Sequence, residues 1–276
     1  MVAEQAKVAG KASMGASGVW PLDQARDLTA IAYERIEELF VCMRIAPGAE
    51  IRTQDLQAMT GLGRTPVHQA VRRLAAETLL EIRPRNGLRV TPIDLSREMR
   101  LADLRRDLDR FVTSAAIRNM TSNDRTALHH LKRRLDAERT TMDVDGFNVI
   151  DKTFNKLLIH ASGERFLERV LSPLHAISRR IGYLSISQVS NREGLLGTID
   201  RHVAIMDAIL AGEEGRACEA SDELVRFSIS MLKEFEDQVD PGLLDIRFAA
   251  SGGVGSAPAT TADAPDDMGR GLPPPA

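Results

Sequence analysis

Proline is distributed very unevenly along this chain, and its placement limits the folds that the chain can adopt. Of the 12 prolines in 276 residues, only Pro173 lies between residues 93 and 240. Proline removes a backbone donor and clashes inside a helix, so a long stretch with a single proline favours helices. No alternating apolar pattern interrupts this stretch. We expect about six helices there, over 94–120, 123–140, 145–162, 164–188, 192–211 and 214–238.

The composition excludes several classes of protein. The chain holds two cysteines, Cys42 and Cys218, which cannot form a disulfide framework or a four-thiolate zinc site. We expect both to be small buried hydrophobic residues. The longest apolar run, residues 39–43, is far shorter than the roughly 20 residues of a membrane helix. The first 20 residues lack the apolar core of a signal peptide. We therefore expect a cytoplasmic protein with no membrane partner.

Glycine and proline also mark the ends of the folded region. Residues 241–276 hold six of each and few large apolar residues, a composition typical of disorder. The expected organisation has four parts: a disordered tail over 1–20, a first domain over 21–92, a helical domain over 93–240 and a second disordered tail over 241–276.

The first domain shows three helical segments separated by turns. Apolar residues of the first are Leu28, Ile31, Ile36, Leu39 and Phe40, and this helix should end before the turn at 46–48. Thr53 is placed to cap a second helix that stops at Gly61. Thr65 is placed to cap a third, with Pro66 at its first helical position.

The pattern changes after Glu77. Residues 79–82 and 88–90 alternate like two strands, and the turn between them contains an Asn-Gly pair. Three helices followed by a basic hairpin describe a winged helix-turn-helix. The fold class that we predict is mainly α, with this winged domain followed by an all-helical bundle.

The third helix and the hairpin are expected to meet DNA. Residues 61–91 carry six arginines and two acidic residues, whereas residues 93–240 are acidic on balance. With Val67, Val71 and Leu74 on the buried face, the arginines of this helix turn outward. The alternative is that these arginines form an ordinary solvated surface and do not contact DNA. The N-terminal turns of such a helix approach the bases, which assigns base contacts to Arg64, Thr65, His68 and Gln69, phosphate contacts to Arg72 and Arg73, and backbone or minor-groove contacts to Arg83, Arg85, Asn86 and Gly87.

Residues 64–74 resemble the recognition helix of the GntR family of bacterial transcription regulators. The resemblance extends over the turn at 46–48, the helix at 53–61 and the wing at 86–90. It implies DNA contacts at Arg64, Thr65 and Gly87. His68 and Gln69 stand where the family usually has Arg and Glu, so the resemblance does not imply an operator sequence.

Three helices of the second domain carry polar groups on apolar stripes. Arg105 shares a stripe with Leu101, Leu108 and Val112, Asp151 shares one with Phe147, Phe154 and Leu158, and His202 lies among Leu195, Ile199 and Met206. Asn155 follows Asp151 by one turn. A buried charge costs several kcal/mol unless it is paired, so these groups should meet each other, a ligand or a metal. An internal Arg105–Asp151 ion pair is the alternative to a binding site.

The second domain resembles the FadR-type, or FCD, ligand-binding domain, on the fragments 104–109, 151–155 and 161–163 and on His202. Many relatives bind a divalent metal there through an Asp, a His four residues later and two further histidines. Here Asp151 and His202 are kept, while Asn155 and Leu224 replace histidines. We interpret this as an incomplete metal site, with at most Asp151, Asn155 and His202 as ligands. A small carboxylate effector would then be held by Arg105 with help from Asn155 and His202.

The sequence thus predicts a dimeric regulator that binds a palindromic DNA operator and responds to a small organic acid. Dimerisation is expected because two winged helices together give useful affinity for paired half-sites. One alternative is a FadR-like sensor of an acyl thioester. Another is an all-α enzyme using Asp151 and His202, but the chain lacks a nucleophile elbow, a P-loop and a dinucleotide fingerprint.

Overall fold

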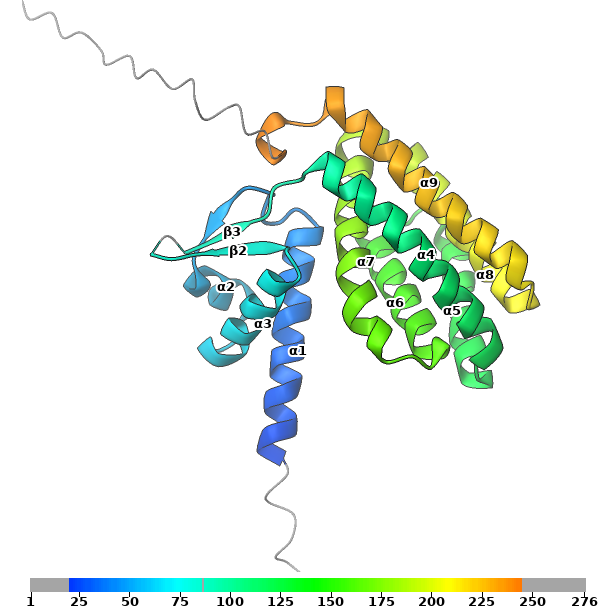
Figure 1. Ribbon diagram of the computed structural model, residues 1–276, viewed down its shortest axis with the longest axis horizontal. Helices are drawn as coiled ribbons and strands as arrows, with labels where there is room; N and C mark the ends of the chain where they lie inside the picture. The colour runs from blue at the N-terminus through cyan, green and yellow to red at the C-terminus, as the bar shows by residue number, and fades with distance from the viewer. Residues whose placement is uncertain (1–19, 86, 245–276) are drawn as a thin grey trace, which may run out of the picture. The chain divides into compact units, whose positions relative to one another are not determined.

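The computed structural model describes residues 20–85 and 87–244 (Figure 1). The two tails expected to be disordered lie almost wholly outside these ranges, and that expectation stays a prediction. Within them the chain forms a small α/β part followed by a helical part, as the fold class predicted. No helix in the described ranges is long and apolar enough to cross a bilayer.

The first part contains three helices and a three-stranded antiparallel sheet. The helices are α1 (Trp20–Val41), α2 (Thr53–Thr60) and α3 (Arg64–Ala76). The strands are β1 (Glu50–Ile51), β2 (Leu80–Arg83) and β3 (Gly87–Val90), in the order β1-β3-β2. β2 and β3 are the expected hairpin, with Glu81 opposite Arg89. β1 was not expected, because two residues are too few for an alternating pattern.

The two predicted helix caps are wrong by one or two residues. Arg52 precedes α2, and the carboxylate of Asp55 accepts its backbone N–H at 3.0 Å, so Thr53 is the first helical residue instead of the cap. Gly63 precedes α3, which puts Pro66 at the third helical position. The first four N–H groups of a helix have no intrahelical partner, so Pro66 costs no hydrogen bond there either. Gly61 ends α2 in the left-handed conformation, as expected.

The core of this part forms between α1, α2, α3 and the sheet. Ile36 and Phe40 of α1 pack with Leu56, Val67 and Leu74, all fully buried. The N-terminal turns of α1 do not reach this core, since Leu28 and Ile31 are 43% and 38% exposed. The buried face of α3 is the predicted one, which leaves its opposite face in solvent.

The second part has the six predicted helices, within a few residues of their expected ends. The helix expected to reach residue 188 ends at Ser185, and a π-helical segment, η1 (Ile186–Ser190), joins it to the next helix. A short 3₁₀ turn, η2 (Pro241–Leu243), ends the described chain. The six helices are α4 (Leu95–Asn119), α5 (Ser122–Glu138), α6 (Val144–Ser162), α7 (Phe166–Ser185), α8 (Asn191–Ala211) and α9 (Glu214–Gln238).

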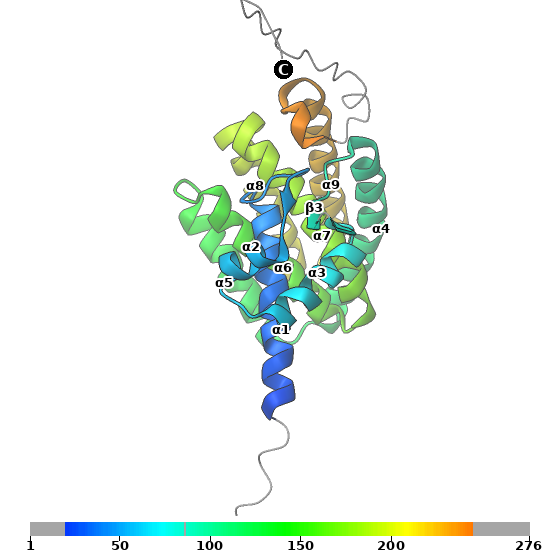
Figure 2. The ribbon, with the colours of Figure 1, turned by 90° about the vertical axis from the view of Figure 1, so that its left-hand side faces the viewer.

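These helices pack into one bundle. α4 packs against both α6 and α9, and α9 also packs along α8; Figure 2 shows α4 at the right-hand edge of the bundle. Phe147, Phe154, Leu171, Ile199 and Met206 form part of the apolar core. Cys42 and Cys218 are free and buried, as expected. Polar groups gather where α4, α6, α7 and α8 meet, and this region forms the candidate site.

Candidate functional site

The outer face of α3 presents the side chains that the sequence assigned to DNA. Arg64, Thr65, His68 and Arg72 are exposed, and their side chains have no hydrogen-bond or ion-pair partner within the described residues. A cation without an internal partner is available for a phosphate or a base edge. These four residues therefore form the part of the predicted reading face that is both exposed and unpaired among the described residues.

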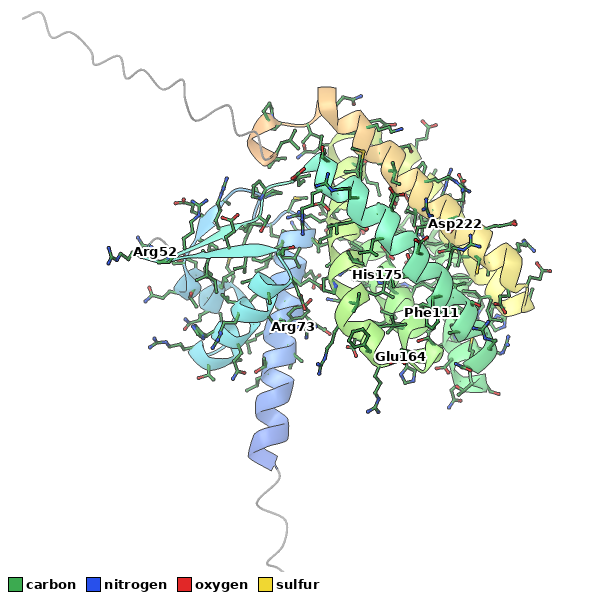
Figure 3. All side chains as sticks on the ribbon, viewed as in Figure 1. Arg52, Arg73, Phe111, Glu164, His175 and Asp222 are labelled. Carbon is green, nitrogen blue, oxygen red and sulfur yellow. The ribbon has the colours of Figure 1, made fainter. Side chains whose placement is uncertain are left out.

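Gln69 and Arg73, on the same helix, are instead held by α1. The hydroxyl of Thr29 donates to Gln69 Oε1 at 2.6 Å. The Arg73 guanidinium lies 3.8 Å from the centre of the Tyr33 ring and pairs with Glu77 Oε1 at 2.8 Å. Figure 3 shows Arg73 between α3 and α1. Arg73 thus helps to fix α3 on α1, a role that the sequence did not predict.

The predicted contact residues of the wing differ in whether they have partners within the protein. Arg83 pairs with Glu50 at 3.2 Å and with Glu81 at 3.4 Å, whereas Arg85 is exposed at a positive φ of 68°. Gly87 has a φ of 88°, and a Cβ there would lie 3.1 Å from the carbonyl oxygen of Ile51. Gly87 is therefore required by the backbone of the sheet.

Two further positions complete the wing. Asn86, a predicted contact, lies outside the described residues. Arg52 was missed by the sequence argument, although it directly precedes α2. Its side chain is exposed beside the wing (Figure 3), and its Cγ is 4.0 Å from the position of a Cβ on Gly87. Arg52 is thus an additional candidate for a phosphate contact.

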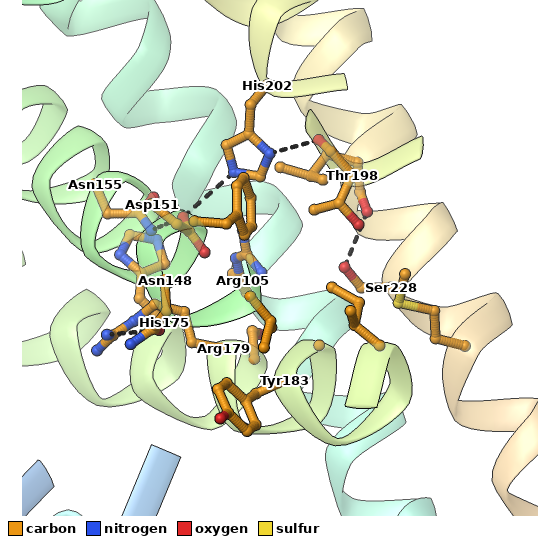
Figure 4. A pocket seen from close by; sticks show the side chains of 17 residues that line it. Arg105, Asn148, Asp151, Asn155, His175, Arg179, Tyr183, Thr198, His202 and Ser228 are labelled. Carbon is orange, nitrogen blue, oxygen red and sulfur yellow. Dashed lines mark hydrogen bonds and ion pairs between the residues drawn. The ribbon is translucent and has the colours of Figure 1, made fainter. Parts of the chain in front are cut away.

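The second candidate site is a cavity in the helical bundle, called here the helical-domain cavity. Its hollow measures about 540 Å³, a volume that includes space open to solvent. The four predicted residues Arg105, Asp151, Asn155 and His202 all line it (Figure 4). The other lining residues are Val144, Phe147, Asn148, His175, Ser178, Arg179, Gly182, Tyr183, Ile186, Thr198, Leu224, Ser228 and Met231.

Arg105 is oriented by a neighbour on its own helix. Its Nε donates to Asp109 Oδ2 at 2.7 Å, and Asp109 Oδ1 lies 2.8 Å from His175 Nε2. Burial acts to raise the pKa of Asp109, but Arg105 and His175 outweigh it and hold that pKa below its ordinary value. Neither Nη1 nor Nη2 of Arg105 has a partner among the described residues. The predicted alternative of an Arg105–Asp151 ion pair is wrong, because Asp109 is the partner.

Asp151 pairs with His202 across the cavity. The Nδ1 of His202 faces the Thr198 carbonyl oxygen at 2.8 Å, and since a carbonyl only accepts, Nδ1 carries a proton. His202 Nε2 lies 3.3 Å from Asp151 Oδ1, which also accepts from Asn155 Nδ2 at 2.7 Å. Burial acts to raise the pKa of Asp151, but His202 lowers it to about 2. The carboxylate is therefore ionised at neutral pH.

The residues present do not fit a divalent metal. Among the described residues, no group of three His, Cys, Asp or Glu side chains could hold an ion. Leu224 lines the cavity with hydrocarbon, and the amide nitrogen of Asn155 is turned towards Asp151. Two ligands and a distant amide oxygen are too few for a stable Zn²⁺ site. The incomplete metal site, with at most Asp151, Asn155 and His202 as ligands, stays a prediction.

Three lining residues of α7 and α6 were missed by the sequence argument. His175 and Arg179 are one turn apart on α7, and Arg179 Nη1 donates to Asn148 Oδ1 at 3.3 Å. The signal was present, since His175 and Arg179 follow Leu171 at the spacing of one helix face. Together with Arg105, Arg179 gives the cavity a second guanidinium.

Comparisons with known proteins identify both parts. Residues 28–90 match the model of the bacterial regulatory proteins of the gntR family, and residues 100–227 match the FCD domain. The chain is a GntR-family regulator with an FCD domain. Its relatives include the uncharacterized HTH-type transcriptional regulator BphR of Paraburkholderia xenovorans, 26% identical over 222 residues, which cover 78% of this chain and 89% of BphR.

Two Escherichia coli proteins support the same assignment. The HTH-type transcriptional repressor RspR is 26% identical over 178 residues, covering 63% of this chain and 75% of RspR. The solved structure of McbR/YncC superposes with a TM-score of 0.68 at 20% identity, covering 76% of this chain and 99% of that one. This likeness shows the fold. The GntR–FCD protein is thus a DNA-binding transcription regulator and not an enzyme, which removes the predicted enzymatic alternative.

Proposed function

We propose that this GntR–FCD regulator acts as a cytoplasmic homodimer that binds a palindromic operator and changes its affinity when a small organic acid occupies the helical-domain cavity. The DNA contacts are Arg64, Thr65, His68 and Arg72 of α3, with the wing and Arg52 on the phosphates. Gln69 and Arg73 support the reading face because their contacts with Thr29 and Tyr33 hold α3 against α1. Dimerisation brings two such faces to the two half-sites.

The effector proposal rests on the hydrogen-bond contacts of Arg105. Its Nε is fixed by Asp109, while both terminal nitrogens lack partners within the described chain and the residue lines the cavity. A guanidinium held in this way presents two parallel donors, the arrangement that matches a carboxylate. We assign Arg105 as the effector-binding cation, with Asn155 as a polar contact beside it. His202 lines the same cavity, and its two ring nitrogens face Thr198 and Asp151.

The cavity favours a small acid over an acyl thioester. An acyl chain needs a continuous apolar channel, whereas Arg105, Arg179, Asp151 and His175 place charged and polar groups around this cavity. The apolar part of the lining comes from Val144, Phe147, Ile186, Leu224 and Met231. A compact ligand with one carboxylate matches these walls.

Three measurements test the proposal. A thermal-shift screen of small organic acids, with and without chelator, should find an acid that stabilises the wild-type protein and fails to stabilise Arg105→Ala. Light scattering and gel-shift titration on the adjacent intergenic DNA should give a dimer and palindrome-specific retention. A monomer without specific retention would overturn the operator part, and equal stabilisation of Arg105→Ala would overturn the effector part.

A further inference from the structure

A buried carboxylate of the DNA-binding domain finds its partners in the helical domain. Glu37 lies on α1 and is only 2% exposed. Its Oε1 is 3.1 Å from Arg179 Nη2 on α7, and its Oε2 accepts from Lys152 Nζ on α6. Burial acts to raise the pKa of Glu37, but the two cations hold it below its ordinary value. These three residues, Glu37, Lys152 and Arg179, are called here the interdomain ion cluster.

Arg179 belongs both to this cluster and to the helical-domain cavity. Its Nη2 faces Glu37, its Nη1 donates to Asn148 on the cavity wall, and its buried Nε has no partner in the described chain. A second cavity, against α1, is lined by Glu37 and Lys152, and it shares Arg179 and His175 with the first. Arg179 therefore touches both the effector site and α1, and among the residues that line the cavity it is the one that forms an ion pair with α1 in the described chain.

The charges of the cluster leave it open to competition. Within the cluster two cations face one carboxylate, and on the cavity side the Arg179 guanidinium also helps to lower the pKa of Asp151. In a buried setting, an added anion and Glu37 would compete for the same guanidinium. Lys152 alone would then remain on Glu37. The contact between α1 and α7 would lose its buried ion pair.

We propose that Arg179 couples the two domains: a carboxylate in the helical-domain cavity draws the Arg179 guanidinium from Glu37 and so loosens α1 of the DNA-binding domain from α7. The inference rests on the proposed function, because it assumes an anionic effector. It adds a positioning residue, Arg179, through which occupancy of the cavity reaches the DNA-binding domain.

The chain offers a matched control on the same helix. Glu34 of α1 pairs with Lys156 of α6, but both side chains are about half exposed, 49% and 54%. An exposed pair contributes little, while breaking a buried pair leaves an uncompensated charge. Hydrogen exchange of the amides of residues 28–41 is measured by mass spectrometry in the full-length protein without DNA or added acid. Glu37→Gln should speed exchange about tenfold or more, and Glu34→Gln less than about twofold.

A second variant brings the competing charge without any ligand. Asn148→Asp places a carboxylate on the cavity side of Arg179, and it should speed exchange of α1 in the same direction as Glu37→Gln. Asn148 Nδ2 also donates to Cys42 Sγ, directly after α1, at 3.4 Å. Asn148→Ala loses that contact without adding a charge, so it is the control and should speed exchange less than Asn148→Asp. Arg179→Lys keeps the charge but loses the forked donors, and it should lie between wild type and Glu37→Gln. It also serves as the second probe of the pair if Glu37→Gln does not fold by circular dichroism.

The outcomes separate this inference from the proposed function. Faster exchange in both Glu37→Gln and Asn148→Asp supports the coupling. Equal rates for Glu37→Gln and Glu34→Gln would overturn it, as would wild-type or slower exchange in Asn148→Asp. Since no DNA or acid is present, such a result leaves operator and effector binding to their own tests.

Discussion

Asp109 holds the effector-binding arginine in place, and its replacement gives the sharpest test of the cavity. The Asp109 side chain is 11% exposed and makes two charge-assisted contacts, 2.7 Å to Arg105 and 2.8 Å to His175. Hydrogen bonds to charged groups contribute about 1.5–3 kcal/mol each, and breaking a buried ion pair costs about 3–5 kcal/mol. Asp109→Asn keeps the shape and one acceptor, so we expect a loss of about 3 kcal/mol in the free energy of unfolding.

Urea unfolding followed by far-ultraviolet circular dichroism measures this loss. Asp107→Asn is the matched control on the same helix, because Asp107 is 74% exposed and lies 3.7 Å from Arg106. An exposed pair of this kind should change the free energy by less than about 0.5 kcal/mol. Equal destabilisation by the two substitutions would refute the role given to Asp109.

The difference in free energy of unfolding between wild type and Asp109→Asn should change with pH in a defined direction. The folded state holds the pKa of Asp109 below the ordinary value, which is about 3.9 in unfolded chains. The stabilisation by Asp109 is therefore fully present above that ordinary value and is lost as the pH falls through the lower, folded pKa. The difference between wild type and Asp109→Asn should be constant near neutral pH and shrink in acid. A difference that grows on acidification would contradict the assignment.

Three further predictions concern the DNA-binding domain. Arg64→Ala should weaken specific operator binding by about 1–3 kcal/mol in fluorescence anisotropy without changing the melting temperature, and a fall in both would argue for a structural role instead. Arg72→Ala should lower the slope of log affinity against log salt by about 1. Arg73→Ala should instead lower the melting temperature, because Arg73 stacks on Tyr33 and pairs with Glu77. Equal effects of the two substitutions on slope and melting temperature would show that the contacts of Arg73 do not stabilise the fold. Burial raises the pKa of Cys42 to about 11, so this thiol should resist iodoacetamide at pH 8 until the protein is unfolded in urea, and rapid labelling of the native protein would contradict its burial.

The fold could be predicted because local signals agree with tertiary packing. The spacing of Val67, Val71 and Leu74 fixed the buried face of α3, and the near absence of proline indicated the helices of the bundle. The caps were misplaced because Thr53 and Thr65 are good capping residues, yet Asp55 bonds back to the backbone of Arg52. β1 depends on pairing with β3, which no local pattern encodes.

The candidate site was predicted less completely, for a physical reason. Periodicity showed that Arg105, Asp151 and His202 face inward, and all three line one cavity. It could not show which charges pair, because the distances between side chains on different helices depend on the packing of the bundle. Nothing in the sequence distinguishes Asp109 from the other acidic residues of α4. Glu37 was hidden among its acidic neighbours on α1, since its partners lie more than 100 residues away.

If an anion on Arg105 controls DNA binding, the affinity of the protein for its operator must change when the acid is added. Anisotropy titrations of the operator are run for the wild type and Arg105→Ala, with and without the acid that raises the wild-type melting temperature most. We expect at least about a fivefold change in wild-type affinity, a typical allosteric coupling, and none in Arg105→Ala. An acid that binds the wild type without changing its operator affinity, or that changes the affinity of both proteins equally, would show that Arg105 does not control DNA binding.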